Sequence, residues 1–203
     1  MVFIDLLTGQ LFVLGFSGLI LAYTVINGAL SYRKGKDFEK VMKSGQIPLA
    51  LLGAYIFITG VYGQFTWPLP GSYNILYYDI FPLWGIFLMA SAWALRSKLN
   101  LQYVGFMALL IGAMSVFYGY TGYQLGLSQA PIAVLGLFGL FGLSGIFGFP
   151  VTMMFDRAME KKKNASAVWM VLLAVFLIAL ILASLLAIYI GVSAVPAHLA
   201  SAP

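Results

Sequence analysis

The sequence predicts an all-α, polytopic membrane protein with six transmembrane helices. Of its 203 residues, 62% are hydrophobic and only 8% are charged, and the mean hydropathy is +0.98. A soluble domain of this composition would expose far too much apolar surface to water. The Lys and Arg residues fall only within residues 33–43, 96–98 and 157–163, and the apolar stretches between these segments are long enough to cross a bilayer.

The three basic segments also predict how the chain threads the membrane. Short loops rich in Lys and Arg stay on the cytoplasmic side, so three such loops place both termini outside the cytoplasm. We therefore expect a multi-pass protein of the cell membrane. The formal charge of +5 is accounted for by loops that face anionic lipid headgroups, so it does not indicate nucleic-acid binding.

At about 20 apolar residues per crossing, the expected spans form a single transmembrane domain over residues 1–203. They lie at about residues 6–32, 47–66, 79–95, 101–124, 128–155 and 165–192. The spans must be helices, because lipid offers no partners for backbone N–H and C=O groups, and the alternating polarity of barrel strands is missing.

The first span lacks the features of a cleavable signal and is expected to be retained. After it, residues 37–43 place Phe38, Val41 and Met42 at helical spacing among charged residues. This segment is either a short amphipathic helix on the inner leaflet or a solvated linker. Between the second and third spans, Pro70-Gly71 favours a type II turn.

Side chains that can cap a helix N-terminus precede four spans: Asp5, Asp79, Ser128 and Asn164. Pro82 and Pro131 then fall in the first turn, where a missing N–H breaks no helical hydrogen bond. Asp79 has an alternative reading. If its span begins earlier, near Ile75, the carboxylate lies inside the membrane and becomes a functional candidate.

Glycines recur regularly in three spans, and we expect them to let neighbouring helices approach closely. They are Gly53 and Gly60 in 47–66, Gly105, Gly112 and Gly119 in 101–124, and Gly136, Gly139, Gly142 and Gly145 in 128–155. A seven-residue spacing keeps glycines on one face, whereas a three-residue spacing winds around the helix. The span at 128–155 is therefore expected to touch several neighbours and to sit centrally.

Spans two and four share a glycine pattern. Gly53-Ala54 with Gly60 matches Gly112-Ala113 with Gly119, and each span precedes one that opens with a cap and a proline. The pattern indicates either a duplicated helical hairpin or a chance match in a chain with 22 glycines.

Polar side chains gather toward the outer ends of the spans. The candidates to line an outer vestibule are Gln64, Thr66, Asp79, Tyr118, Thr121 and Gln124. The alternative is an aromatic belt at the headgroup level, which Tyr and Trp form without any function.

Composition excludes several kinds of chemistry. The chain has no Cys, and His198 is its only His, so thiolate metal sites and bis-imidazole haem cannot form within it. No metalloprotease, serine hydrolase or nucleotide-binding motif is present. We expect no metal, no cofactor and no enzymatic activity.

The segment Thr66-Trp67-Pro68-Leu69-Pro70-Gly71-Ser72-Tyr73-Asn74, continuing to Asp79, resembles an uncharacterised, largely archaeal membrane family, domain of unknown function 981. The resemblance implies a membrane protein and supplies no activity. In size and span number the chain is also similar to six-span acetate and urea channels, but their N-P-A-P-L-G-L motif is missing, so this likeness concerns only the fold.

Two functional hypotheses follow. The first is a passive channel or binding protein for a small neutral or weakly acidic solute, because the spans lack the ionisable groups that an ion-coupled pump needs. The second is a non-catalytic accessory subunit of a membrane complex. Expected partners are the lipid bilayer and either further copies of the chain or another membrane protein.

Overall fold

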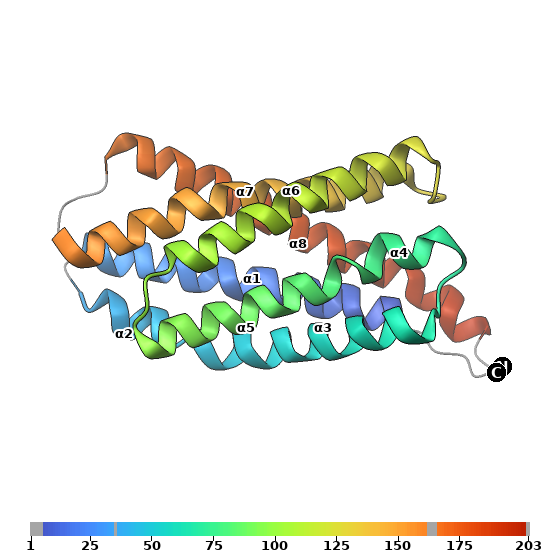
Figure 1. The fold of residues 1–203 in the computed structure, drawn as a ribbon, viewed down its shortest axis with the longest axis horizontal. Helices are drawn as coiled ribbons and strands as arrows, with labels where there is room; N and C mark the ends of the chain where they lie inside the picture. The colour runs from blue at the N-terminus through green and yellow to red at the C-terminus, as the bar shows by residue number, and fades with distance from the viewer. Residues whose placement is uncertain (1–5, 35, 162–165, 202–203) are drawn as a thin grey trace.

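The computed structural model describes residues 6–34, 36–161 and 166–201, which contain helices and no strand (Figure 1). The helices are α1 (Leu6–Arg33), α2 (Phe38–Lys43), α3 (Gln46–Thr66), α4 (Ser72–Tyr78), α5 (Phe81–Ser97), α6 (Gln102–Gln124), α7 (Pro131–Lys161) and α8 (Ala167–Ser201). Six segments are long and apolar enough to span a membrane, with α2–α3 and α4–α5 each forming one of them. The expected all-α, six-span fold class is confirmed.

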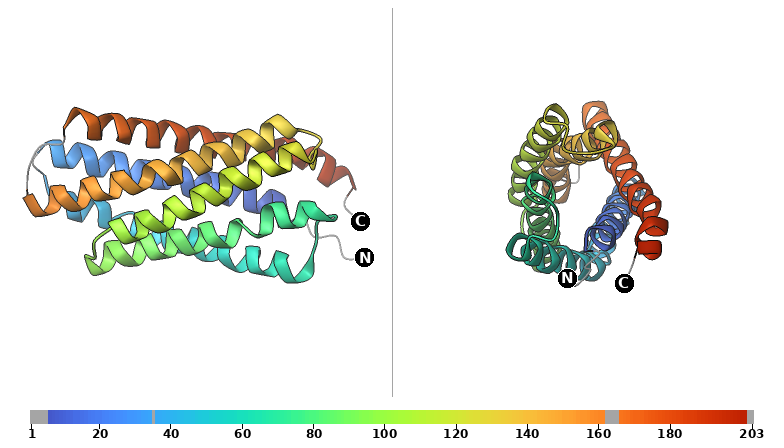
Figure 2. Two further views of the ribbon diagram at one scale, coloured as in Figure 1. Left: turned by 45° about the horizontal axis from the view of Figure 1, so that its top comes forward. Right: turned by 90° about the vertical axis from the view of Figure 1, so that its right-hand side faces the viewer.

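The six spans form a ring when viewed along the long axis (Figure 2, right). The order around the ring follows the chain, from α1 through α3, α5, α6 and α7 to α8, and α8 packs back on α1. The side between α5 and α6 has the fewest contacts. The expectation that residues 128–155 sit centrally is wrong, because α7 is a member of the ring between α6 and α8.

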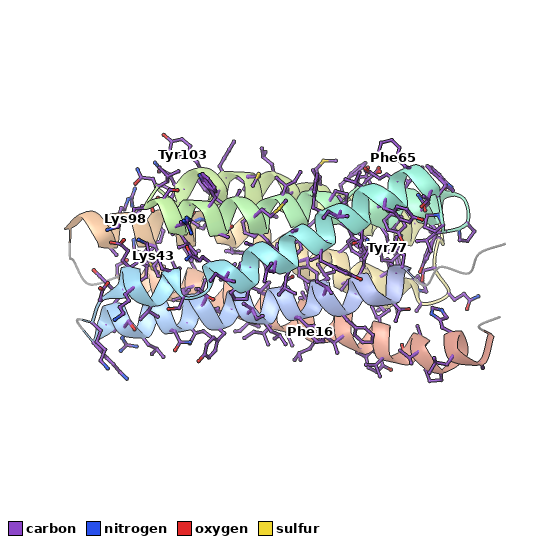
Figure 3. The ribbon with its side chains drawn as sticks, turned by 90° about the horizontal axis from the view of Figure 1, so that it is seen from below. Phe16, Lys43, Phe65, Tyr77, Lys98 and Tyr103 are labelled. Carbon is purple, nitrogen blue, oxygen red and sulfur yellow. The ribbon has the colours of Figure 1, made fainter. Side chains whose placement is uncertain are left out.

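The two ends of the ring differ in charge. Lys43 and Lys98 lie together at one end, and Tyr77 and Phe65 lie toward the other (Figure 3). We call these the basic end and the terminal end, because the first turn of α1 and the last turn of α8 lie at the latter (Figure 1).

Several helix boundaries differ from the expected spans. The last helix continues past residue 192 to Ser201, and His198 lies within it with Nδ1 3.1 Å from Thr8 Oγ1 of α1. Helix α7 begins at Pro131, so Ser128 does not cap it and instead accepts the Ala130 amide. The remaining expected caps, Asp5 and Asn164, lie outside the described residues.

The third span is broken into two helices. Its first part, α4, begins at Ser72, and α5 begins only at Phe81. The N-cap position of α5 is Ile80, which makes no side-chain capping bond, so the expected capping role of Asp79 is wrong. Asp79 instead lies at the break, several residues inside a candidate span that starts at Ser72.

The loop before α4 is pinned by a buried asparagine. Asn74 is 1% exposed, donates to the Gly63 carbonyl (3.2 Å) and accepts the Leu69 amide (3.1 Å). Gly71 has the positive φ of +52° that glycine tolerates, but its ψ of −137° does not fit the expected type II turn.

The segment at 37–43 forms a helix, α2, capped by Asp37, which accepts the Lys40 amide at 2.9 Å. Its apolar face turns into the ring rather than onto the leaflet. Phe38 is 8% exposed and stacks at 5.0 Å on Phe155, and Met42 is 5% exposed. Helix α2 therefore covers the basic end of the ring.

Close helix crossings occur at two matching glycine pairs. A Cβ on Gly53 would lie 2.9 Å from the Gly85 carbonyl oxygen, and one on Gly85 would lie 2.7 Å from that of Gly53. Likewise, a Cβ on Gly112 would lie 2.5 Å from the Gly142 oxygen, and one on Gly142 would lie 2.8 Å from the Gly112 oxygen. The α3–α5 and α6–α7 hairpins thus share the same reciprocal glycine contact.

The other glycines of interest differ in their surroundings. A Cβ on Gly60 would meet Pro82 at 2.8 Å, and Gly119 would meet Phe138 at 2.5 Å. A Cβ on Gly105 would collide with Thr152, and one on Gly145 would lie 2.5 Å from the Ala108 oxygen. Gly136 has only a side-chain neighbour at 3.3 Å, and nothing lies within 4 Å of a Cβ on Gly139.

Candidate functional site

Four hollows follow one another through the ring, from the terminal end to the basic end. The terminal hollow is open, has a volume of about 510 Å³ and reaches from α4 across to α8. Below it lie a first cavity of about 30 Å³ and a second cavity of about 60 Å³. The basic hollow, of about 230 Å³, lies under α2. Neighbouring hollows share wall residues or are separated by one layer of side chains.

The wall of the terminal hollow is partly polar. It is lined among others by Ser72, Tyr73, Tyr77, Ser128, Gln129 and Ile190. Tyr77 is 1% exposed and forms the floor, where its ring contacts Phe81 at 5.6 Å and Phe138 at 5.5 Å. Because Phe81 and Phe138 also line the first cavity, this aromatic layer separates the two spaces.

The first cavity is almost wholly apolar. It is lined among others by Leu14, Phe81, Trp84, Ser115, Phe138 and Phe141. The Ser115 hydroxyl donates across the helix interface to the Phe138 carbonyl at 2.9 Å, so its proton is already engaged. An apolar cavity of this kind tends to stay dry.

The second cavity has the same character. It is lined among others by Leu21, Met42, Trp84, Ser91, Ser144 and Phe155. Ser91 and Ser144 each donate to a carbonyl of their own helix, at 2.7 and 2.8 Å, and Thr152 does the same at 2.7 Å. These hydroxyls therefore offer the cavity acceptor lone pairs rather than protons.

Trp84 and Phe87 line both cavities and separate them. The two rings lie 4.9 Å apart, and the Trp84 ring meets Phe141 edge-on at 5.4 Å. The indole Nε1–H donates to Ser17 Oγ on α1 at 3.1 Å, and Ser17 in turn donates to the Leu14 carbonyl at 2.8 Å. The divider is thus held by contacts from α1, α5 and α7.

At the basic end, Met42, Leu95 and Leu101 line both the second cavity and the basic hollow. Helix α2 is fastened over this end by Glu39, whose carboxylate lies 2.9 Å from Lys98 Nζ and 3.2 Å from Lys43 Nζ. The hydrogen bond to Glu39 raises the pKa of the Lys98 ammonium above its ordinary value. Both partners are largely exposed, so this pairing is a weak fastening.

The basic hollow contains a buried carboxylate that the sequence analysis missed. Asp156 of α7 is 6% exposed, and its two oxygens accept the amides of Leu101 and Gln102, each at 2.8 Å. Asp156 therefore caps α6 from another helix. The available signal was that Leu101, at the N-cap position of α6, has no side chain that can cap.

The six residues predicted to line an outer vestibule do not meet in one hollow. Gln64, Thr66 and Gln124 are exposed, and the Thr66 hydroxyl donates to the Tyr62 carbonyl of its own helix at 2.8 Å. Tyr118 and Thr121 instead line a separate groove of about 200 Å³ between α4 and α6. The Tyr118 hydroxyl donates to Asp79 Oδ2 at 2.8 Å.

Within the described residues, no group of three or more His, Cys, Asp or Glu side chains could hold a metal ion. Comparison with protein-family models matches residues 1–201 to the family described as "Protein of unknown function (DUF981)". A search of curated proteins gave no match, and a search of solved structures gave none either.

Proposed function

Because the chain belongs to the DUF981 family, whose description assigns no activity, we propose from its geometry that it is a passive channel or binding protein for a small neutral or weakly acidic solute. The observation that carries the proposal is the alignment of four hollows through the ring, with single layers of side chains between them. Weakly acidic solutes would enter in their protonated, neutral form.

The walls of the two cavities favour an uncharged solute. Their lining consists of uncharged side chains, and the hydroxyls among them are engaged with backbone carbonyls. Moving an ion into such surroundings without a partner carries a large desolvation cost. Passive passage is favoured because an ion-coupled pump needs ionisable groups along its route to load and release its ion. Neither cavity is lined by one, and the buried Asp156 carboxylate in the wall of the basic hollow is engaged with two backbone amides.

Cavity size favours a solute of a few non-hydrogen atoms. A single water needs roughly 10–15 Å³ on this measure of volume, and the cavities have about 30 and 60 Å³. The conformation described here is closed, because Tyr77, Trp84 and Met42 each stand between neighbouring hollows. Passage would require these side chains to move in turn.

We also propose that the basic end faces the cytoplasm and that both termini lie outside it, in the cell membrane. The positive-inside rule supports this orientation, since Lys43 and Lys98, from two of the three basic segments, lie together at one end of the ring. In this orientation the terminal hollow is the outer mouth, and close glycine crossings hold the walls together.

Flux into liposomes tests the function. Purified protein is reconstituted, and the entry of acetic acid, urea, glycerol and water is compared with protein-free vesicles, with a trapped dye to confirm that the vesicles are intact. We expect faster entry of at least one of these solutes. Entry no faster than in protein-free vesicles for all four would remove the channel proposal, and a stable heteromeric partner found in native membranes would then favour an accessory subunit.

A further inference from the structure

We propose that Trp84 is the residue that determines which solutes pass, and that Ser17 holds it in the closed position. This inference rests on the proposed passive function and identifies where along the ring selection occurs.

Trp84 stands between the two cavities. It lines both cavities, it is the largest side chain that the two cavities share, and it is 7% exposed. Phe87 lies beside it at 4.9 Å between ring centres, so the two rings form one layer across the ring interior. Any solute that moves between the cavities has to pass this layer.

The Trp84 side chain is held both by a ring contact and by a hydrogen bond. Its ring meets Phe141 of α7 edge-on, and its single polar atom donates to Ser17 of α1. Ser17 is fully buried and donates to Leu14, which completes a chain of two hydrogen bonds. Because a buried indole N–H without an acceptor is unfavourable, moving the ring out of this position is costly unless another acceptor takes over.

The chemistry of this pair indicates a solute class. When Trp84 swings aside, its indole N–H leaves the Ser17 oxygen and needs another acceptor, which a neutral solute that carries a carbonyl or hydroxyl oxygen can supply as it passes. Urea and protonated acetic acid have such an oxygen and no charge, whereas an anion such as acetate would bring an unpaired charge between uncharged walls. The layer would therefore pass small neutral solutes with an acceptor oxygen in preference to anions and to larger solutes.

Ser184 supplies a matched control for Ser17. Both serines are completely buried, with 0% exposure, and both donate to a carbonyl of their own helix. Within the described residues Ser184 accepts no hydrogen bond from another helix, whereas Ser17 accepts the Trp84 indole N–H. Replacing either serine by Ala removes one buried hydroxyl oxygen, but only the change at Ser17 removes the bond to Trp84.

The test measures urea entry into liposomes for the wild type, Trp84→Ala, Ser17→Ala and Ser184→Ala. If opening the layer no longer has to break a hydrogen bond of ordinary strength, the barrier to passage falls enough to make the rate about tenfold faster. We expect about this increase for Ser17→Ala, at least as much for Trp84→Ala with weaker rejection of larger solutes, and no change for Ser184→Ala. If Trp84→Ala does not fold, Trp84→Leu takes its place.

Two further outcomes separate the proposals. Urea entry through the wild type with unchanged rates for Trp84→Ala and Ser17→Ala overturns the role of Trp84 and leaves the passive function standing. If the wild type and all variants give the same rates as protein-free vesicles with all four solutes, both the passive function and the role of Trp84 are overturned. Equal acceleration by Ser17→Ala and Ser184→Ala overturns the holding role of Ser17.

Discussion

The Tyr118 hydroxyl donates to the Asp79 carboxylate at 2.8 Å and joins α6 to the break between α4 and α5. Tyr118 lies six residues before the end of α6, which places the bond about 9 Å below that end. A carboxylate at this depth needs a partner. The bond also bridges the side of the ring where α5 and α6 have the fewest contacts.

Removing the Tyr118 hydroxyl should therefore destabilise the protein. A hydrogen bond to a charged group contributes about 2 kcal/mol, so we expect Tyr118→Phe to lower the free energy of unfolding in detergent by roughly that amount. Tyr120→Phe, at a 56% exposed position, should change little. A double-mutant cycle with Asp79→Ala should give a coupling energy, and strictly additive effects would contradict the bond.

The crossing of α6 and α7 should not tolerate a methyl group at Gly112. A Cβ there would lie 2.5 Å from the Gly142 oxygen, which is backbone and cannot move aside. We expect Gly112→Ala to cost about 1–3 kcal/mol. Gly139→Ala meets nothing within 4 Å and should stabilise by up to about 1 kcal/mol through helix propensity. Unfolding measurements in which both changes have the same sign would contradict this.

The loop that carries the family-like segment should depend on Asn74. Asn74→Asp keeps the acceptor for the Leu69 amide but replaces the donor to Gly63 with an oxygen. The Gly63 carbonyl then keeps only the Trp67 amide as a donor and faces a carboxylate oxygen in place of the Asn74 N–H. We therefore expect a loss of about 2 kcal/mol and faster proteolysis within residues 67–71. Exposed Asn100→Asp is the control, and equal proteolysis of the two variants would show that Asn74 does not pin the loop.

Removing the Asp156 carboxylate should lower the free energy of unfolding more than removing an ordinary N-cap does. Asp156→Ala leaves the amides of Leu101 and Gln102 without this acceptor in a largely buried place, so we expect a cost of about 3 kcal/mol. Asp37→Ala removes an exposed cap from α2 and should cost about 1 kcal/mol. Thermal unfolding of the two variants checks the order, and a larger effect at Asp37 would refute it.

The orientation can be tested directly because the natural chain has no Cys. Gln129 lies in the loop before α7, and Leu99, 54% exposed, lies at the basic end. On intact cells, a membrane-impermeant maleimide should label Gln129→Cys, whereas Leu99→Cys should react only after permeabilisation. The reverse labelling pattern would invert the proposed topology.

The number and approximate limits of the spans could be predicted from sequence, because charge and apolar length are properties of a linear segment. The break at Asp79 could not. A proline in the first turn fits a helix that starts at Asp79 as well as one that starts at Phe81. The residues before Asp79 are also apolar enough to extend the span outward to Ser72.

The lining of the cavities could not be predicted either, because the lipid and the ring interior are both apolar. Hydrophobicity therefore does not distinguish Trp84, which lines the cavities, from Trp93, which is 65% exposed. Polarity was equally uninformative near the terminal end. Gln64 and Gln124 are exposed, whereas the apolar Val134 lines the terminal hollow. Which face turns inward is decided by packing between helices.

The uncharged walls of the two cavities have an electrical consequence. A transmembrane potential does work only on charge that moves along the membrane normal, about 2.3 kcal/mol per elementary charge for each 100 mV. Neither Trp84 nor Phe87 carries a formal charge, so swinging these rings moves none. Opening of the layer should then be indifferent to voltage, and a gradient of solute concentration alone would set the direction of net flow.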